Sequence, residues 1–247
     1  YQKTNRYLNA IEVYKKAIKL KPQIAHLKIS LLTCKAFACD WSNPKYSKEI
    51  LNKIDTLGQE ICPFELLPLE DNPNNHLKRA KYFFYKKYRR VTKNISYAPK
   101  KRIRVGYFSA DFRKHAVMFL IKGLFKLHNK DKFDVYIYSL NSKEDELTEE
   151  LKKSINVFRN LSDISDENAA LIAREDSLDI AIDLMGYTKN TRLSIFSLRV
   201  APIQISYLGY PGSTGADCMD YLIADKVIIP EEFRKFYSEK VIYMPNC

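Results

Sequence analysis

The sequence is poor in glycine, with seven residues of this type among 247. It contains neither a GxGxxG fingerprint nor a P-loop, so nothing specific supports binding of a dinucleotide or of ATP. Four of the seven glycines nevertheless gather near the end of the chain: Gly186, Gly209, Gly212 and Gly215. Glycine tolerates positive φ and close approach to the backbone, so these segments are either ordinary tight turns or places where a ligand meets the main chain.

Long apolar runs are also missing, and no segment approaches the roughly 20 apolar residues that a membrane-spanning helix needs. The polar start YQKTNRY does not resemble a signal peptide. The cysteines form no CxxC pair and are odd in number and scattered: Cys34, Cys39, Cys62, Cys218 and Cys247. This distribution argues against a disulfide framework or a zinc site and favours a reducing compartment. We therefore expect a cytoplasmic protein that does not interact with membranes.

Acidic residues are scarce in residues 1–100, which hold 20 Lys and Arg against 8 Asp and Glu, whereas residues 101–247 hold 21 of each. The whole net charge of +12 therefore belongs to the first part. Its densest segment, 78–93, carries eight bases and no acid, interleaved with five aromatic residues. The pattern is compatible with a nucleic-acid-binding surface. An amphipathic helix with an aromatic core face and a solvated basic face explains it better, so nucleic acid is not an expected partner.

Residues 1–60 are predicted to be helical. In YLNAIEVYKKAIKLKP, the small residues Ala10 and Ala17 flank Tyr14, and Pro22 closes the segment. Small residues at this spacing let a neighbouring helix approach, and proline ends a helix. The pattern resembles the second helix of a tetratricopeptide repeat, with a generic amphipathic helix as the alternative. Because one repeat cannot bury its own face, we expect the chain to have been cut from a longer repeat array.

Residues 61–100 contain several prolines and are predicted to be a helical connector, with a hinge at 94–100. From residue 101 apolar strands alternate with helices. The strands are expected at 103–108, 133–140, 178–186, 203–209, 220–228 and 240–244. Such alternation predicts a doubly wound, mostly parallel sheet of the α/β class. The sequence therefore predicts a helical part at 1–60, a connector at 61–100 and a doubly wound α/β domain at 101–247.

Three turns follow predicted strands: SADFRKH at 109–115, DLMGYTKNTR at 183–192 and LGYPGSTGA at 208–216. In a parallel sheet all three would lie at the carboxyl edge of the strands, where open α/β sheets bind ligands. The first turn contains Asp111 and His115, and both side-chain types can accept a proton during catalysis. We therefore expect the chemistry of this protein at that edge.

Several segments together resemble the protein O-linked N-acetylglucosamine transferases, above all the tetratricopeptide-bearing bacterial members. They are RIRVGYFSADFRKHAV, DKFDVYIYSL, the run from DLMGYTKNTR to DYLIAD, YSEKVIYMPNC, and upstream CDW and PFELL. The resemblance implies a GT-B enzyme with two Rossmann-like lobes. Such an enzyme transfers N-acetylglucosamine from UDP-GlcNAc to Ser and Thr hydroxyls of proteins, with inversion and without a metal or other cofactor. It also implies that residues 101–247 are the N-terminal catalytic lobe, that the second lobe is missing, and that the fragment is inactive alone.

The resemblance also assigns site residues. His115 matches the active-site histidine of the family and Asp111 the aspartate of the same turn, and either one could take the acceptor proton, directly or through water. Two further groups of residues match positions that face the donor sugar or line the cleft. These expected donor-binding residues are Leu208, Gly209, Tyr187, Thr188 and Arg192.

Two positions depart from the family pattern. Met185 replaces a residue that is usually polar, and Phe64 stands where the animal enzymes have a further active-site histidine. These departures and the missing lobe leave an alternative open, namely a non-catalytic tetratricopeptide and α/β scaffold for protein interaction. The sequence contains no Asp-x-Asp motif, which agrees with the metal independence that the resemblance implies.

Overall fold

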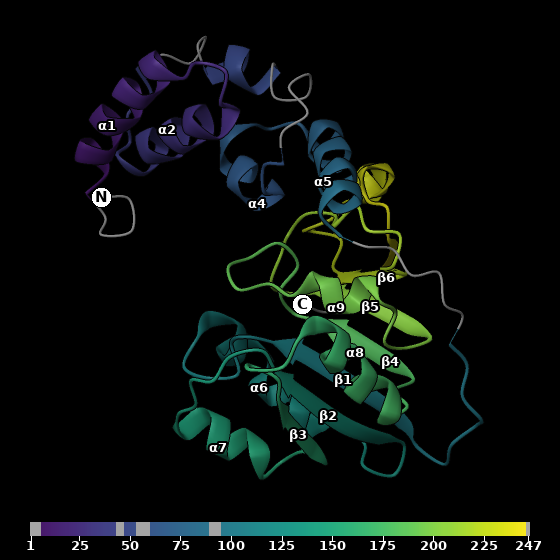
Figure 1. The fold of residues 1–247 in the computed structure, drawn as a ribbon. Helices are drawn as coiled ribbons and strands as arrows, with labels where there is room; N and C mark the ends of the chain where they lie inside the picture. The colour runs from purple at the N-terminus through teal and green to yellow at the C-terminus, as the bar shows by residue number, and fades with distance from the viewer. Residues whose placement is uncertain (1–5, 43–46, 53–59, 89–94, 246–247) are drawn as a thin grey trace. The chain divides into compact units, whose positions relative to one another are not determined.

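The computed structural model describes residues 6–42, 47–52, 60–88 and 95–245. The chain forms two compact units, residues 1–86 and 87–247. In Figure 1 the first unit is purple and blue and consists of helices, whereas the second is teal, green and yellow and contains the sheet. No helix in the described part of the chain is long and apolar enough to cross a lipid bilayer.

The first unit begins with two helices that pack on each other, α1 (Tyr7–Leu20) and α2 (Ala25–Phe37). Ala10 of α1 is buried in the contact with α2 and Tyr14 packs against the same cluster, as expected for a small residue beside an aromatic one. Residues 47–52 are also helical. They are followed by α4 (Pro63–Leu66), η2 (Leu67–Leu69) and α5 (Pro73–Lys87). A second apolar cluster, with Ile29 and Leu66 at its centre, joins α2 to α4.

Helix α5 distributes its aromatic residues over two faces. Phe83 and Phe84 are buried, whereas Tyr82 and Tyr85 are 38% and 63% exposed among the lysines of the helix. The predicted aromatic core face is therefore correct for the phenylalanines and wrong for these two tyrosines, whose hydroxyls favour a position near water. Residues 89–93 of the basic segment and residue 94 of the predicted hinge lie outside the described residues, and residues 95–100 have no regular secondary structure.

The second unit is built on a seven-stranded sheet in the order β3-β2-β1-β4-β5-β6-β7, with every neighbouring pair parallel. The predicted parallel α/β sheet is confirmed. Its strands are β1 (Ile103–Ser109), β2 (Phe133–Ser139), β3 (Val157–Asn160), β4 (Ile180–Asp183), β5 (Ile203–Tyr207), β6 (Tyr221–Ala224) and β7 (Lys240–Tyr243). The sequence did not predict β3, a short edge strand.

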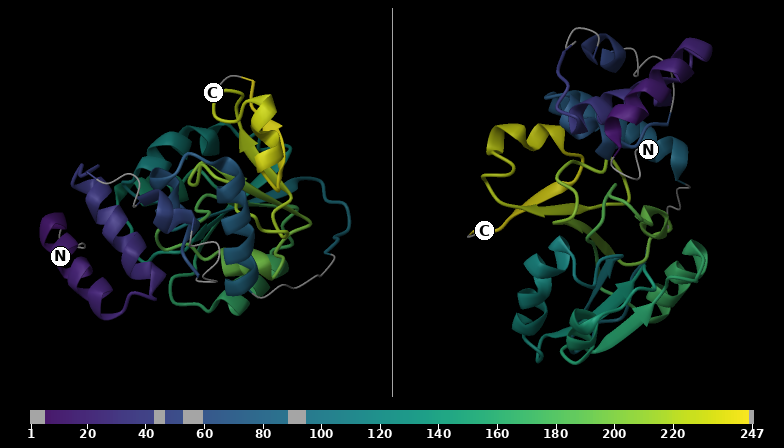
Figure 2. Two further views of the ribbon diagram at one scale, coloured as in Figure 1. Left: turned by 90° about the horizontal axis from the view of Figure 1, so that it is seen from above. Right: turned by 90° about the vertical axis from the view of Figure 1, so that its left-hand side faces the viewer.

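Helices cover both faces of this sheet (Figure 2). They are α6 (Ala116–Leu127), α7 (Glu146–Lys152), α8 (Asp166–Glu175), α9 (Leu193–Ser197) and the 3-10 helix η3 (Glu231–Phe236). On one face, Ile121 and Phe125 of α6 pack on the central strands. On the other face, Phe108 stacks on Tyr138 with ring centroids 4.3 Å apart and meets Phe196 of α9 edge-on at 5.0 Å. Covering both faces explains why the central strands are mostly apolar.

The chain leaves the middle of the sheet in two directions. β1 leads to β2 and β3 on one side, whereas β4 begins the series β5, β6 and β7 on the other. β1 and β4 are neighbours that pair in parallel, with Phe108 opposite Asp183, so their carboxyl ends lie side by side. Open α/β sheets bind ligands in the crevice at such a reversal of strand order. The topology therefore points to the ends of β1 and β4.

Candidate functional site

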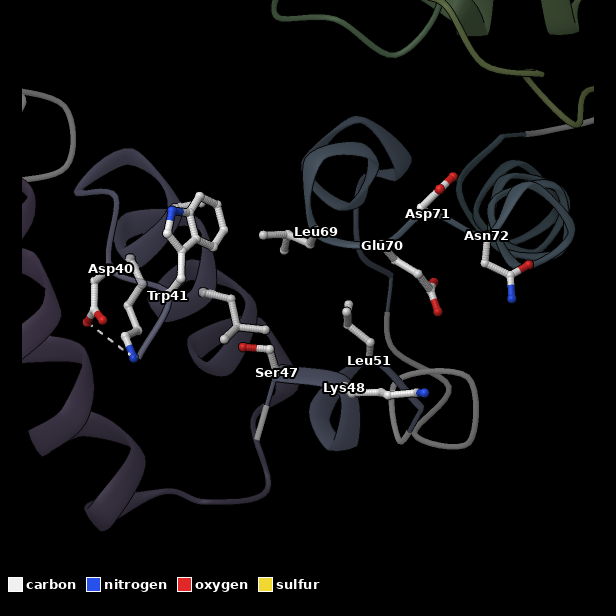
Figure 3. A pocket seen from close by; sticks show the side chains of 12 residues that line it. Asp40, Trp41, Ser47, Lys48, Leu51, Leu69, Glu70, Asp71 and Asn72 are labelled. Carbon is white, nitrogen blue, oxygen red and sulfur yellow. Dashed lines mark ion pairs between the residues drawn. The ribbon is translucent and has the colours of Figure 1, made fainter. Parts of the chain in front are cut away.

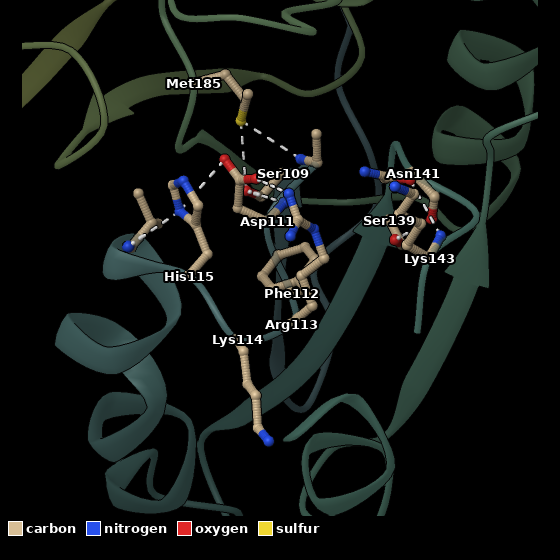
Figure 4. Close-up of polar contacts among 12 residues, drawn as sticks. Ser109, Asp111, Phe112, Arg113, Lys114, His115, Ser139, Asn141, Lys143 and Met185 are labelled. Atoms are coloured by element: carbon tan, nitrogen blue, oxygen red, sulfur yellow. Dashed lines mark hydrogen bonds and ion pairs between the residues drawn. The ribbon is translucent and has the colours of Figure 1, made fainter. Parts of the chain in front are cut away.

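His115 lies between β1 and α6, in the first of the three predicted turns. It is the N-cap residue of α6, with extended backbone (φ −152°, ψ 154°), and its Nδ1 accepts a hydrogen bond from the Val117 N–H at 3.3 Å. The same Nδ1 lies 3.5 Å from Oδ2 of Asp111. The imidazole is 40% exposed and the carboxylate only 11%. An accessible ring and a buried carboxylate thus meet at the edge of the sheet (Figure 4).

The two partners of Nδ1 correspond to different tautomers of the neutral ring. A hydrogen bond from the Val117 amide requires a lone pair on Nδ1, which places the proton of a neutral imidazole on Nε2. A hydrogen bond to Asp111 requires a proton on Nδ1, which leaves the lone pair of Nε2 able to accept one. The Asp111 carboxylate therefore favours the form of His115 in which Nε2 is a base, as in other histidine–carboxylate pairs.

Asp111 is held by its own turn. Its backbone N–H donates to Oγ of Ser109 at 3.0 Å, and its carbonyl accepts from the Arg113 N–H at 2.8 Å. Its Oδ1 lies 3.4 Å from Nη2 of Arg113, which donates to it. These contacts fix the carboxylate and direct Oδ2 toward His115. Asp111 is suited to orienting the ring, and the more exposed His115 to receiving a proton from a substrate.

The second turn is held by a carboxylate that the sequence analysis did not single out. Asp183, the last residue of β4, is 2% exposed, and its two oxygens accept hydrogen bonds from the N–H groups of Met185 and Gly186, both at 2.9 Å. Burial raises the pKa of Asp183 to about 6, and the two amide hydrogen bonds offset this rise only in part. The signal in the sequence was an acidic residue that ends an apolar strand.

The raised pKa of Asp183 should make the stability of the fold depend on pH. Its pKa is about 6 in the folded chain against an ordinary value of 3.8, so the folded state binds the extra proton between these values. The stabilisation linked to that proton is fully present below about pH 4 and is lost as the pH rises through about 6. We expect Asp183→Asn to remove this part of the pH dependence. Urea unfolding across this range measures it, and an unchanged slope of unfolding free energy against pH would contradict the prediction.

Tyr187 and Thr188 belong to the same turn, and both hydroxyls are bonded within the protein. Tyr187 is 2% exposed, its hydroxyl donates to the carbonyl of Thr214 at 2.5 Å, and its ring meets Tyr210 edge-on at 5.4 Å. Oγ1 of the half-buried Thr188 donates to the carbonyl of Met185 at 2.8 Å. Tyr187 therefore joins the second turn to the third, while Thr188 shapes the second turn and stays partly accessible.

The third turn contacts the second through glycine. At Gly209 a Cβ would lie 1.9 Å from the carbonyl oxygen of Leu184. At Gly186, where φ is +55°, a Cβ would lie 2.3 Å from Cβ of Tyr210. Leu208, half-buried, also has positive φ, at 68°. At Gly186 and Gly209, tight packing of one turn on the other is sufficient reason for glycine.

Arg192 has a different environment from the other predicted site residues. Its Nε donates to Oδ1 of Asp166 at 2.6 Å, Nη1 donates to the carbonyl of Leu161 at 2.6 Å, and Nη2 donates to the carbonyl of Ile164. Every nitrogen of the guanidinium group thus has a partner within the protein. These bonds join the start of α9 to the start of α8 and to the loop that precedes α8. Arg192 therefore has a structural role.

We expect Arg192→Ala to lower the free energy of unfolding by roughly 2 kcal/mol, because three acceptors lose a charged donor. Arg192→Lys should recover little of this loss, since an ammonium group lacks the planar fork that reaches all three. Urea unfolding of the three proteins measures both effects. A loss below about 0.5 kcal/mol in Arg192→Ala, the range of ordinary surface substitutions, would show that these bonds do not stabilise the fold.

A separate cavity of about 440 Å³ lies in the first unit (Figure 3). Its lining comes from α2, the loop with the 66% exposed Trp41, residues 47–51, η2 and residues 70–72. The ion pair between Lys35 and Asp40, at 3.2 Å, is part of its wall. None of the predicted site residues lines this cavity. The candidate site is therefore the edge formed by the turns after β1, β4 and β5.

Comparison with known proteins shows the family of the chain. The sequence profile of glycosyl transferase family 41 matches residues 74–247, more than half of the chain. The chain belongs to this family. It is 38% identical over 148 residues to a probable UDP-N-acetylglucosamine–peptide N-acetylglucosaminyltransferase, SEC of Arabidopsis thaliana, covering 60% of this chain and 15% of that protein. It is 30% identical over 232 residues to the corresponding transferase of Caenorhabditis elegans, covering 84% of this chain and 20% of that protein.

A solved structure supports the fold of this family 41 chain. A mutant of the O-GlcNAc transferase of Thermobaculum terrenum superposes with a TM-score of 0.71 at 22% identity, covering 98% of this chain and 48% of that one. The predicted resemblance to O-GlcNAc transferases is confirmed, as is the Rossmann-like lobe of a GT-B glycosyltransferase with a helical segment before it. The chain spans a fifth or less of the length of the two curated relatives.

Proposed function

We propose that the protein of which this chain is part transfers N-acetylglucosamine from UDP-GlcNAc to Ser and Thr hydroxyls of proteins, with inversion. The observation that carries the proposal is the His115–Asp111 pair at the reversal point of the sheet in a family 41 chain. The names of the two curated relatives, both UDP-N-acetylglucosamine–peptide N-acetylglucosaminyltransferases, support the choice of donor and acceptor.

In the proposed reaction the acceptor hydroxyl attacks the anomeric carbon on the face opposite UDP. The new bond between oxygen and carbon forms as the bond to the phosphate oxygen breaks, which inverts the configuration and releases UDP. The hydroxyl proton passes to Nε2 of His115, and Asp111 stabilises the resulting imidazolium. The 40% exposure of the ring leaves room for an acceptor to approach it.

The donor sugar is proposed to lie along the second and third turns, beside Leu208, Gly209 and Thr188. The buried Tyr187 does not contact the sugar but holds the two turns together through its hydrogen bond to the Thr214 carbonyl. A second lobe, outside this chain, would supply most of the nucleotide contacts. We therefore propose that this chain alone binds UDP-GlcNAc weakly and is inactive; submicromolar binding by the chain alone would contradict this division between lobes.

The test is an assay of a longer polypeptide that includes both lobes, with UDP-GlcNAc and a protein rich in Ser and Thr. Mass spectrometry should find N-acetylhexosamine on Ser or Thr, and the proposed metal independence predicts the same yield with a chelator present. A folded polypeptide that transfers no sugar would favour the non-catalytic scaffold, and transfer from another nucleotide sugar alone would correct the donor. We also propose that the protein is cytoplasmic, which cell fractionation tests.

A further inference from the structure

A sulfur atom joins the ends of β1 and β4. Sδ of Met185, in the turn after β4, accepts hydrogen bonds from the Ala110 N–H at 3.3 Å and from the Ser109 hydroxyl at 3.4 Å (Figure 4). All three residues are at most 1% exposed. Water therefore cannot replace the thioether as acceptor, and a buried N–H without an acceptor is unfavourable. The thioether is a weak acceptor, but here it satisfies two buried donors.

This contact belongs to a series of contacts that ends at the proposed base. The Asp183 carboxylate fixes the backbone N–H of Met185 at one end. The Ser109 hydroxyl donates its proton to Sδ of Met185 and accepts one from the Asp111 N–H at 3.0 Å, so one hydroxyl serves both bonds. The Asp111 carboxylate then lies 3.5 Å from Nδ1 of His115.

We propose that Met185 is a positioning residue: its thioether holds the Ser109–Ala110 segment so that Asp111 orients His115 for proton transfer. The inference rests on the proposed function. It gives a physical meaning to a position where the resemblance leads one to expect a polar side chain, because an acceptor is what the two buried donors require. Met185 does not touch the reacting atoms and acts through Asp111 and His115.

Three variants of the longer polypeptide distinguish the effect of losing the hydrogen-bond acceptor from the effect of changed packing. Met185→Leu keeps the size and removes the acceptor, and we expect kcat to fall about tenfold, the rate equivalent of one lost hydrogen bond. The KM for UDP-GlcNAc should change by less than about twofold, because the Met185 side chain is 1% exposed and is not among the side chains proposed to face the donor sugar. Met185→Gln restores an acceptor and should recover most of kcat. Met118→Leu is the matched control: Met118 is 2% exposed in α6 and contacts the sheet core.

A readout without catalysis separates this inference from the proposed function. Hydrogen exchange of the Ala110 amide should be faster in Met185→Leu than in the wild type or in Met118→Leu. If the wild type transfers no sugar, the proposed function fails while the exchange rates still decide the positioning. Equal exchange and equal kcat in Met185→Leu and Met118→Leu would overturn the inference. A Met185→Gln variant as slow as Met185→Leu would do the same, because it would assign the effect to packing.

Discussion

His115→Ala in the longer polypeptide should lower kcat for transfer from UDP-GlcNAc by roughly 10²- to 10⁴-fold, the range that a positioned general base contributes. The imidazole is 40% exposed and the Asp111 carboxylate only 11%, so the carboxylate cannot readily replace the ring as the base. The fold should survive, because the ring is 40% exposed and its hydrogen bond is a single N-cap contact to Val117. Steady-state kinetics and circular dichroism measure the two effects.

His26→Ala is the control for this substitution. His26 is an exposed residue of α2 in the first unit, so removing its ring tests for non-specific effects of losing a histidine. We expect unchanged kinetics. Near-normal turnover of His115→Ala would remove His115 as the base and shift attention to Asp111 or to a water relay.

Gly209→Ala should cause the largest loss of stability. The added Cβ would lie 1.9 Å from the carbonyl oxygen of Leu184 and 2.8 Å from its carbon, and both are backbone atoms at the end of β4. Relief requires the second and third turns to separate, so we expect a loss of about 3 kcal/mol or more in the free energy of unfolding. Thermal and urea unfolding measure this loss.

Gly123→Ala is the matched control. Gly123 lies in α6, where a Cβ would meet nothing within 4 Å. The substitution should raise the free energy of unfolding by roughly 0.5 to 1 kcal/mol, because alanine favours a helix more than glycine does. If both variants had the same stability, the close approach of the Gly209 backbone to Leu184 would not be a constraint on the fold.

The class of fold could be predicted from the sequence because its signals are local. Each central strand is an apolar run bounded by small or polar residues, and covering both faces of a parallel sheet requires such runs. The strand β3 was missed for the same reason: Val157 and Phe158 are half-buried and Arg159 and Asn160 exposed, so this edge strand has no apolar run to recognise.

The candidate site was only partly predictable. His115 and Asp111 lie in one turn, so their proximity follows from four residues of sequence. The hydrogen bonds of Asp183 to Met185 and Gly186 are local, but its burial and the contact of Gly209 with Leu184 depend on which strands become neighbours, and no local pattern specifies that. The resemblance predicted Arg192 as a donor-binding residue. Its three hydrogen bonds within the protein connect segments that are far apart in the sequence, so no local pattern could predict them.

The most direct test is a crystal structure of the longer polypeptide with UDP-GlcNAc bound. It should show the sugar at the edge formed by the turns after β1, β4 and β5, with its anomeric carbon facing the side of His115 and the sugar ring against Leu208 and Gly209. A sugar bound away from these turns, for example in the cavity beside Trp41, would contradict the assignment of this edge as the active site.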